Sequence, residues 1–308
     1  MSNLFKAHSA LFIVNAIYGA NYVIAKGLMP DVIGPSGFIL LRVIGACVLF
    51  WLVFALAFEK VLWKDLARMA LCAVFGVAVN QLFFFNGLSL TSPINASVIM
   101  TSTPIIVLIM ASVILGERIT WVRSLGVLIG AFGAIALILS TKGGASTATE
   151  KGDLFILVNA TSYSLYLVTV KPLMLKYRPL TVITWVFTFG LIFVAPFGIG
   201  QFAQVGWSDL ATADIMSMAF VVVCTTFLAY LLNIFALKIV SPTVSSSYIY
   251  LQPILAGSFA LWFSTSSFLQ DAFGREADYS NDIDLFKVFC ALFIFAGVYL
   301  VSKPVQRA

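Results

Sequence analysis

The sequence carries very little charge for its length. Only 10% of its 308 residues are Asp, Glu, Lys or Arg, while 61% are hydrophobic. A soluble domain of this size needs many more charged side chains to cover its surface, so a soluble globular protein is excluded. The charges that are present fall into short clusters between long apolar runs. This pattern is typical of a protein that crosses the lipid bilayer several times.

Residues that catalyse reactions or bind metals are also scarce. The single histidine, His8, lies near the N-terminus, and the chain contains neither an HExxH nor a GxSxG motif. The four cysteines lie far apart in apolar segments, without histidines at metal-ligand spacing. The sequence therefore predicts no enzyme, no catalytic residue, no cofactor and no metal site.

Two further absences narrow the range of partners. No stripe of basic residues with interleaved aromatic residues is present, which argues against nucleic-acid binding. No Asp or Glu lies well inside an apolar run, so the chain lacks the membrane carboxylate that proton-coupled exporters of cationic drugs require. The expected partners are the lipid bilayer and a small-molecule solute.

Apolar segments long enough to cross a bilayer occur ten times. A hydrocarbon core of about 30 Å needs roughly 20 helical residues. The ten predicted transmembrane helices span residues 7–26, 35–58, 66–88, 93–115, 120–140, 153–171, 180–199, 212–236, 242–264 and 285–302. The predicted fold class is thus an all-α integral membrane protein with ten transmembrane helices.

Positive charges are distributed unequally between the two sides that ten helices define. Of the 18 Lys and Arg residues, twelve lie on the side of the termini, five lie on the opposite side, and Arg42 lies inside a helix. Cytoplasmic loops carry the excess of Lys and Arg in membrane proteins. We therefore expect a multi-pass membrane protein with its N- and C-termini in the cytoplasm.

The two halves of the chain share a pattern of prolines. Ser92-Pro93 followed by Pro104 recurs as Ser241-Pro242 followed by Pro253, with every residue displaced by 149 positions. Each half holds five helices, an odd number, so the second half has to enter the membrane from the opposite face. The sequence thus predicts two inverted five-helix repeats, a common construction of secondary transporters.

A second match sets the limits of the repeats. The segment around Asn15 recurs around Asn159, displaced by 144 positions. We predict a first repeat over residues 1–141, an inter-repeat loop over 142–152 and a second repeat over 153–308. The second repeat has gained an acidic external insertion at about 265–284, which lacks the glycine and the terminal glutamate of a calcium loop. We interpret it as a solvated loop or lid.

Pro104 and Pro253 lie near the middle of the fourth and ninth predicted helices. A proline cannot donate its backbone hydrogen bond, so each frees a carbonyl one turn earlier and kinks its helix. Serine, threonine and amide side chains surround both positions. They either hold helices together or line an aqueous cavity, and their symmetric placement favours the cavity. We predict that both prolines shape mobile, gating helices.

Further helices contribute neutral hydrogen-bonding residues mixed with aromatic residues, which suit a substrate with polar and apolar parts. The predicted substrate-binding residues are Tyr18, Asn21, Asn80, Tyr163, Tyr166, Tyr230, Tyr248 and Gln252.

Arg42 and Lys26 form a possible charge site. Arg42 lies about 10 Å deep in the second helix at 1.5 Å per residue, where a guanidinium is costly. It either reaches outward to the lipid headgroups, aided by Asp31, or attracts a carboxylate or phosphate. Lys26 at the outer end of the first helix is either an interface anchor or part of the same site.

Several of these motifs resemble the EamA family of the drug/metabolite transporter superfamily, across essentially the whole chain. In the first half they are Tyr18-Gly19-Ala20-Asn21-Tyr22 with Lys26, then Arg42, the segment 93–104, Gly116-Glu117 and Gly126-Gly130-Gly133. In the second half they are Tyr163-Ser164-Leu165-Tyr166, Pro242, Gln252-Pro253 and Gly297. The Gly-Glu pair expected near Ser264 is missing, and the insertion replaces it.

This resemblance implies a ten-helix permease with cytoplasmic termini. It also implies alternating access around a site formed by the first, third, fourth, sixth, eighth and ninth helices. We therefore predict a transporter of the bacterial inner (cell) membrane that exports small metabolites, amino acids or similar neutral or zwitterionic solutes. An alternative is a transporter of anionic metabolites that uses Arg42 and Lys26. A non-transporting membrane scaffold or sensor is the alternative from another class.

Overall fold

The computed structural model describes residues 3–26, 28–90, 99–140, 150–266 and 285–302, and helix is the only regular secondary structure in these ranges. In chain order the elements are α1 (Asn3–Lys26), α2 (Pro35–Ala55), α3 (Trp63–Ala73), η1 (Val74–Val79), α4 (Asn80–Leu90), α6 (Thr103–Leu115), α7 (Trp121–Ser140), α8 (Glu150–Lys176), α9 (Pro179–Ala203), α10 (Thr212–Phe220), η2 (Val221–Leu228), α11 (Ala229–Ile239), α12 (Pro242–Ser247), η3 (Tyr248–Leu251), α13 (Gln252–Thr265) and α15 (Leu285–Ser302).

These elements form ten helical segments, at the ten predicted positions. Elements that continue one another make one segment, so α3, η1 and α4 form the third, α10, η2 and α11 the eighth, and α12, η3 and α13 the ninth. Five described helices are long and apolar enough to cross a bilayer: Pro35–Ala55, Trp63–Leu88, Glu150–Lys176, Pro179–Ala203 and Thr212–Ile239. Shorter apolar helices accompany them. The prediction of an all-α membrane protein is confirmed.

Local sequence signals explain where helices begin and end. Pro35 and Pro179 each occupy the first turn of the second helix of their half, where a missing N–H costs nothing. They are 144 positions apart, the displacement that also relates Asn15 to Asn159. α6 ends at Gly116, whose φ of 69° is left-handed, a backbone conformation that glycine adopts without strain.

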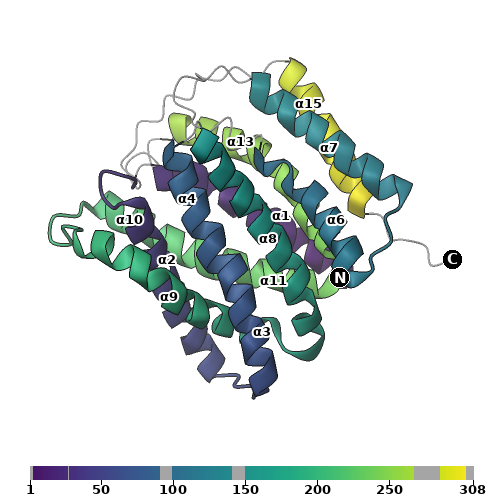
Figure 1. Ribbon diagram of the computed structural model, residues 1–308. Helices are drawn as coiled ribbons and strands as arrows, with labels where there is room; N and C mark the ends of the chain where they lie inside the picture. The colour runs from purple at the N-terminus through teal and green to yellow at the C-terminus, as the bar shows by residue number, and fades with distance from the viewer. Residues whose placement is uncertain (1–2, 27, 91–98, 141–149, 267–284, 303–308) are drawn as a thin grey trace.

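Contacts between helices follow the two-repeat organisation (Figure 1). The second helices of the two halves, α2 and α9, pack against each other, and so do the fifth helices, α7 and α15. The first helix of each half packs against the third and fourth of the other half: α1 contacts α11 and α13, and α8 contacts α4 and α6. Such exchanged contacts are expected of two repeats related by a twofold axis.

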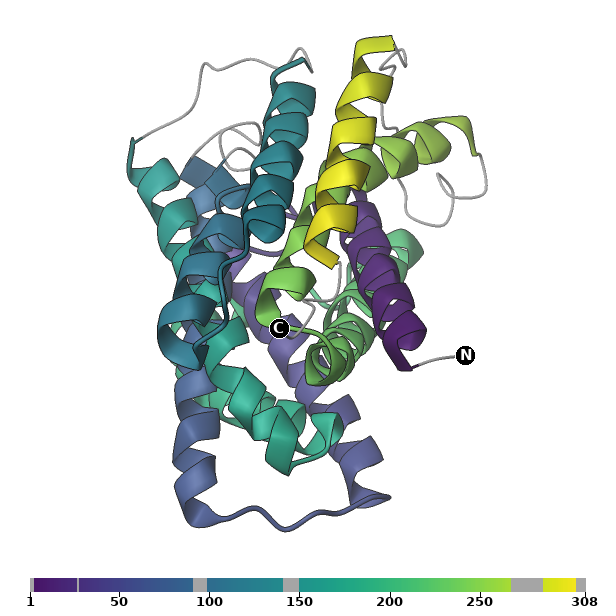
Figure 2. The same cartoon turned by 90° about the vertical axis from the view of Figure 1, so that its right-hand side faces the viewer.

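The pair α7 and α15 depends on glycine. The two helices lie side by side, as Figures 1 and 2 show. A Cβ atom at Gly297 would lie 2.5 Å from the backbone nitrogen of Gly130, and one at Gly133 would lie 2.8 Å from the carbonyl oxygen of Cys290. Close backbone approach through small residues is the usual way in which membrane helices associate, so these glycines allow the contact.

Both halves interrupt their third helix with a π-helical stretch, η1 in one and η2 in the other. π-helical turns are rare and are frequent at functional sites. Side chains satisfy the displaced carbonyls: Ser162 of α8 donates to the Phe75 carbonyl at 2.7 Å, and Thr226 donates to that of Val221 at 2.8 Å. The sequence-based prediction contained no such stretch, because hydropathy does not distinguish π from α geometry.

The fourth and ninth helices are both interrupted near their proline. α6 begins at Thr103 with Pro104 in its first turn, after a turn at Thr101 and Ser102. In the ninth helix, the 3-10 segment η3 precedes α13, and Pro253 lies in the first turn of α13. The backbone is thus broken into separate helices at both places. Segment 91–98, with Pro93, lies outside the described residues.

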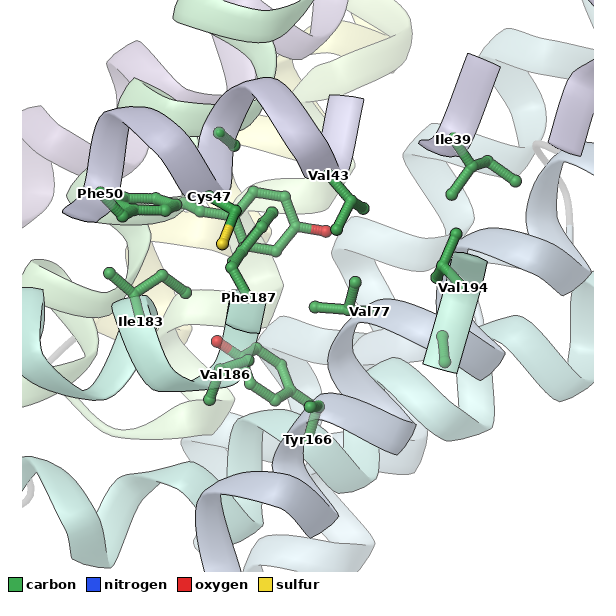
Figure 3. Close-up of a cluster of buried hydrophobic side chains, with 14 of the residues drawn as sticks. Ile39, Val43, Cys47, Phe50, Val77, Tyr166, Ile183, Val186, Phe187 and Val194 are labelled. Carbon is green, nitrogen blue, oxygen red and sulfur yellow. The ribbon is translucent and has the colours of Figure 1, made fainter. Parts of the chain in front are cut away.

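The larger apolar core lies among α2, η1, α8 and α9. Figure 3 shows Val43 of α2, Val77 of η1 and Tyr166 of α8 in this core, with Val186 and Phe187 of α9. All five side chains are completely buried. A second core joins the start of α1 to α7, α12 and α15.

The outer surface is apolar as well. Val113, Trp121 and Phe132 are among many large hydrophobic side chains that are more than half exposed. Exposed apolar area on this scale is incompatible with water and suits the hydrocarbon of a bilayer. Most of the inter-repeat loop and nearly all of the acidic insertion lie outside the described residues.

Candidate functional site

Six polar and aromatic side chains come together between the two halves, and we call them the central polar cluster. They are Tyr18 of α1, Arg42 of α2, Gln81 of α4, Tyr163 and Tyr166 of α8, and Tyr230 of α11. Three belong to each half. In an inverted-repeat transporter the substrate site lies at this interface.

Gln81 and Tyr230 join the halves directly. The Gln81 amide donates a hydrogen bond to the Tyr230 hydroxyl over 3.2 Å, and both side chains are at most 6% exposed. The two residues are 149 positions apart, the displacement that relates the prolines of the repeats. Equivalent positions of two repeats can meet only beside the axis that relates them, so this pair marks the middle of the interface.

Tyr163 and Tyr166 lie one helical turn apart on α8, with ring centroids 6.2 Å from each other. The Tyr163 hydroxyl accepts a hydrogen bond of 2.8 Å from the side-chain amide of Asn233. The side-chain oxygen of Asn233 in turn accepts one of 3.1 Å from the Ser245 hydroxyl. The Tyr166 ring packs on η1, where a Cβ at Gly76 would lie 2.4 Å from it. The glycine therefore provides the space for the ring.

Arg42 is buried at the centre of the cluster. Its side chain is 5% exposed, its Nε donates to the Thr226 hydroxyl at 3.0 Å, and the phenols of Tyr230 and Tyr18 lie near it. The guanidinium carbon lies 5.6 Å from the Phe38 ring centroid and 5.3 Å from that of Phe85, within the range of cation–π attraction.

This burial corrects one of the two interpretations of Arg42. A side chain that reaches outward to the headgroups would be exposed at the lipid or water boundary, whereas Arg42 points into the interface between the halves. Asp31 is exposed and, within the described residues, forms no ion pair with Arg42. The other interpretation, attraction of an anionic group, fits the geometry.

The central polar cluster and its neighbourhood contain buried polar atoms without a hydrogen-bond partner among the described residues. Gln81 Oε1 and the Tyr166 hydroxyl belong to the cluster, Asn21 Oδ1 lies about one turn after Tyr18 on α1, and Thr225 Oγ1 is next in sequence to Thr226. Buried polar atoms are normally paired, because leaving one unpaired costs free energy. Unpaired acceptors and hydroxyls on these helices therefore indicate that a polar ligand or water is accommodated beside the cluster.

Three predicted binding residues lie elsewhere or contribute differently. The Tyr248 hydroxyl lies 2.8 Å from His8 Nδ1 and the two rings stack, in the second core near the start of α1. Gln252 donates to Asn15 at 2.9 Å, which fixes α13 to α1. Asn80 contributes its backbone carbonyl, which accepts a 2.6 Å hydrogen bond from Asn159. The structure does not bring these three side chains into the central polar cluster.

The serine hydroxyls near the two helix breaks mainly donate hydrogen bonds to backbone carbonyls of their own segment. Ser102 donates to the Ile99 carbonyl at 2.6 Å, and Ser247 donates to that of Val244 at 2.8 Å. Of these residues Ser245 reaches toward the cluster, through Asn233. The side chains of Lys26 and Pro253 lie outside the described residues.

Acidic residues of the first half hold the two halves together on the side of the termini. The Asp65 carboxylate accepts from the Lys176 ammonium at 2.9 Å and from the Tyr177 hydroxyl at 2.8 Å. The Glu117 carboxylate accepts from the Thr243 hydroxyl at 3.1 Å. On the opposite side, the Gln201 side-chain oxygen accepts hydrogen bonds from the backbone N–H groups of Ser36 and Gly37, at the N-terminus of α2.

Among the polar residues of the third helix, the sequence prediction chose Asn80 as the binding residue and not its neighbour Gln81. Adjacent residues of a helix point about 100° apart, and hydropathy alone does not decide which of the two faces the other half. The displacement of 149 positions was an available signal, because it pairs Gln81 with Tyr230. Phe38 and Phe85 were missed because aromatic residues are common throughout the chain.

The fold and the cluster define a class: a helical membrane protein of two inverted halves with a buried polar site between them. Comparison with known proteins gives the family. The model of the EamA-like transporter family matches residues 5–139 and 150–270, and the chain belongs to this family.

Individual relatives agree with this assignment. An uncharacterized transporter of Archaeoglobus fulgidus is 30% identical over 173 residues, which cover 56% of this chain and 60% of that protein. A second from the same organism is 24% identical over 303 residues and covers 96% and 97%. A probable terminal-alkyne amino-acid exporter of Streptantibioticus cattleyicolor is 28% identical over 133 residues, covering 43% and 44%. A solved crystal structure with 16% identity has a TM-score of 0.70 over 95% of this chain and 96% of that chain, which shows the fold alone.

Proposed function

We propose that this protein exports small metabolites, amino acids or similar neutral or zwitterionic solutes, by alternating access across the bacterial inner membrane, with both termini in the cytoplasm. The observation that carries this proposal is the central polar cluster, because it combines buried, unpaired polar atoms with contributions from both halves. A solute bound there contacts both halves at once, so their relative movement exposes it to one side and then to the other.

Two further observations support the solute class and the orientation. One relative is named a probable terminal-alkyne amino-acid exporter, and the cluster mixes amide, phenol and aromatic groups that suit an amino-acid solute. The excess of Lys and Arg on the side of the termini supports their cytoplasmic placement.

The test is the flux of a labelled amino-acid panel in proteoliposomes, with and without a pH gradient. We expect saturable flux that falls about tenfold or more in kcat/KM when Gln81 is replaced by Leu, because one buried hydrogen bond and one acceptor are lost. Gln204→Leu is the matched control, since Gln204 is exposed at the end of α9. Equal flux in Gln81→Leu and the control would contradict this placement of the site.

The sequence also pointed to Gln252, and Gln252→Ala tests that prediction in the same assay. Its contact with Asn15 favours a role in helix packing. We therefore expect this variant to lower stability more than it lowers flux. A loss of flux at unchanged stability would contradict the packing role and support the sequence-based prediction.

Transport of an anionic metabolite is a second candidate. The specific observation in its favour is that Arg42 forms no ion pair within the described part of the chain. The same proteoliposome panel, extended to monocarboxylates without an amino group, separates the two candidates.

A further inference from the structure

Arg42 is a charge that no acidic residue among the described residues neutralises. The ion pairs among the described residues are Arg68 with Asp65, Lys176 with Asp65, and Arg123 with Glu117. All three lie on the side of the termini. Arg42 has the Thr226 hydroxyl, two phenols and two aromatic rings around it, and none of these carries a negative charge at neutral pH.

A lone buried charge is costly to the fold. Removing an ion from water costs several kcal/mol unless an opposite charge compensates it, and a guanidinium does not escape this cost by losing its proton. Cation–π contacts and one hydroxyl compensate only part of it. A residue that is retained at such a cost commonly has a functional role when it lies inside a membrane.

The second half shows that the fold itself does not need this charge. The displacement of 144 positions that relates Pro35 to Pro179 pairs Arg42 with Val186. Val186 is fully buried in α9 and packs in the larger apolar core (Figure 3). The same place in the repeat is therefore filled by a hydrocarbon side chain in one half and by a guanidinium in the other.

The geometry leaves part of the guanidinium available. Among the described residues, only Nε donates a hydrogen bond, to the Thr226 hydroxyl, which itself donates to the Val221 carbonyl of η2. Within the described residues, the two terminal nitrogens of Arg42 have no hydrogen-bond acceptor. Two parallel N–H groups at the edge of a planar fork match the two oxygens of a carboxylate.

We infer that Arg42 binds the carboxylate of the transported solute, and that Gln81 Oε1 and Asn21 Oδ1 accept hydrogen bonds from its amino group. The inference deepens the proposed function and depends on it, because it names the recognised group at the same site. The buried amide oxygens of Gln81 and Asn21 lack partners among the described residues, and an ammonium group supplies the donors. A carboxylate with a nearby amino group is thus the recognised unit.

The first test compares each amino acid of the labelled panel with its amino alcohol, in which CH2OH replaces the carboxylate. We expect the wild type to transport the amino acid at least about 100-fold more efficiently, because a site built to bind a charged group rejects the analogue that lacks it. Arg42→Gln should lose this preference, and Arg42→Lys should keep the preference with about tenfold lower efficiency, because it retains the charge without the fork. Arg118→Gln, at an exposed arginine on the side of the termini, is the matched control and should behave as wild type.

A second test needs no solute. If Arg42 serves to bind the solute and does not stabilise the fold, Arg42→Gln should unfold at a temperature equal to or above that of the wild type. The reason is that the substitution removes an uncompensated buried charge. A clear fall in that temperature would make Arg42 a structural residue and would overturn the inference.

The flux experiment distinguishes a failure of the inferred role of Arg42 from a failure of the proposed transport function. Equal transport of amino alcohols and amino acids by the wild type would leave a transporter but overturn the role of Arg42. Transport of monocarboxylates alone, lost in Arg42→Gln, would keep Arg42 as the carboxylate site and refute the amino-group contacts. Absence of flux for every solute in the panel would overturn the proposed function together with this inference.

Discussion

Two buried charges of opposite sign behave very differently in this molecule. Asp65, at the terminal side, is 2% exposed and is surrounded by Lys176, Arg68 and the Tyr177 hydroxyl. Arg42, at the centre, is 5% exposed and, among the described residues, is opposed by no acidic group. Both charges lie where the two halves of the chain meet.

The difference separates contacts that hold the protein together from contacts that leave a place for a solute. A carboxylate with cationic and hydroxyl partners on the other half stabilises the pairing of the halves. A cation that lacks an anionic partner among the described residues gains most when an external anion arrives. Replacing Asp65 should therefore mainly change stability, whereas replacing Arg42 should mainly change transport.

The largest effect on stability is expected from Asp65→Ala. This change leaves the Lys176 ammonium and the buried Tyr177 hydroxyl without their shared acceptor, so we expect the unfolding temperature in detergent to fall by several degrees. The selectivity between an amino acid and its amino alcohol should not change.

A double-mutant cycle of Asp65→Ala with Lys176→Ala measures the coupling between these residues. Additive losses would show that the pair contributes nothing across the two halves. The contrast with Arg42 would then rest on burial alone.

An intermediate effect is expected from Gly76→Ala in η1. The added Cβ would lie 2.4 Å from the Tyr166 ring, so the ring has to shift within a filled core, which costs about 1–3 kcal/mol. Flux should fall because Tyr166 belongs to the central polar cluster, while the contacts of Asp65 remain. Unfolding temperature and kcat/KM measured on one preparation check both expectations.

Gly200→Ala is the control for this substitution. No atom lies within 4 Å of a Cβ built at Gly200, and alanine favours helix over glycine by about 0.5–1 kcal/mol. This control should be as stable as the wild type or slightly more stable. If it lost flux as Gly76→Ala does, the position of Tyr166 would not explain the result.

The smallest effect is expected from Arg68→Gln. The Arg68 side chain is 67% exposed and its Nη1 lies 3.4 Å from Asp65, a distance and an exposure at which an ion pair contributes at most about 1 kcal/mol. We expect stability within about 0.5 kcal/mol of wild type and unchanged flux. A large loss would show that Arg68, and not Lys176, is the main partner of Asp65.

Hydropathy predicted the helices well because burial in hydrocarbon imposes a simple length rule on each crossing segment. The tyrosines of α8 and Tyr230 were also predicted, since polar and aromatic residues stand out within apolar runs. Tyr248 and Gln252 satisfied the same criteria, but they lie against His8 and Asn15. One sequence cannot separate these two groups, because the rotation of each helix is set by its neighbours.

The sequence by itself determined the class of protein, the ten helical segments and the inverted repeats, because composition, segment length and proline spacing are local or periodic properties. Only the tertiary structure decided that Gln81 meets Tyr230, that Arg42 is buried without an ion partner among the described residues, and that π-helical turns interrupt both third helices. These properties depend on how helices that are far apart in the chain are rotated and packed against one another. That rotation is fixed by the close fit of side chains between the halves.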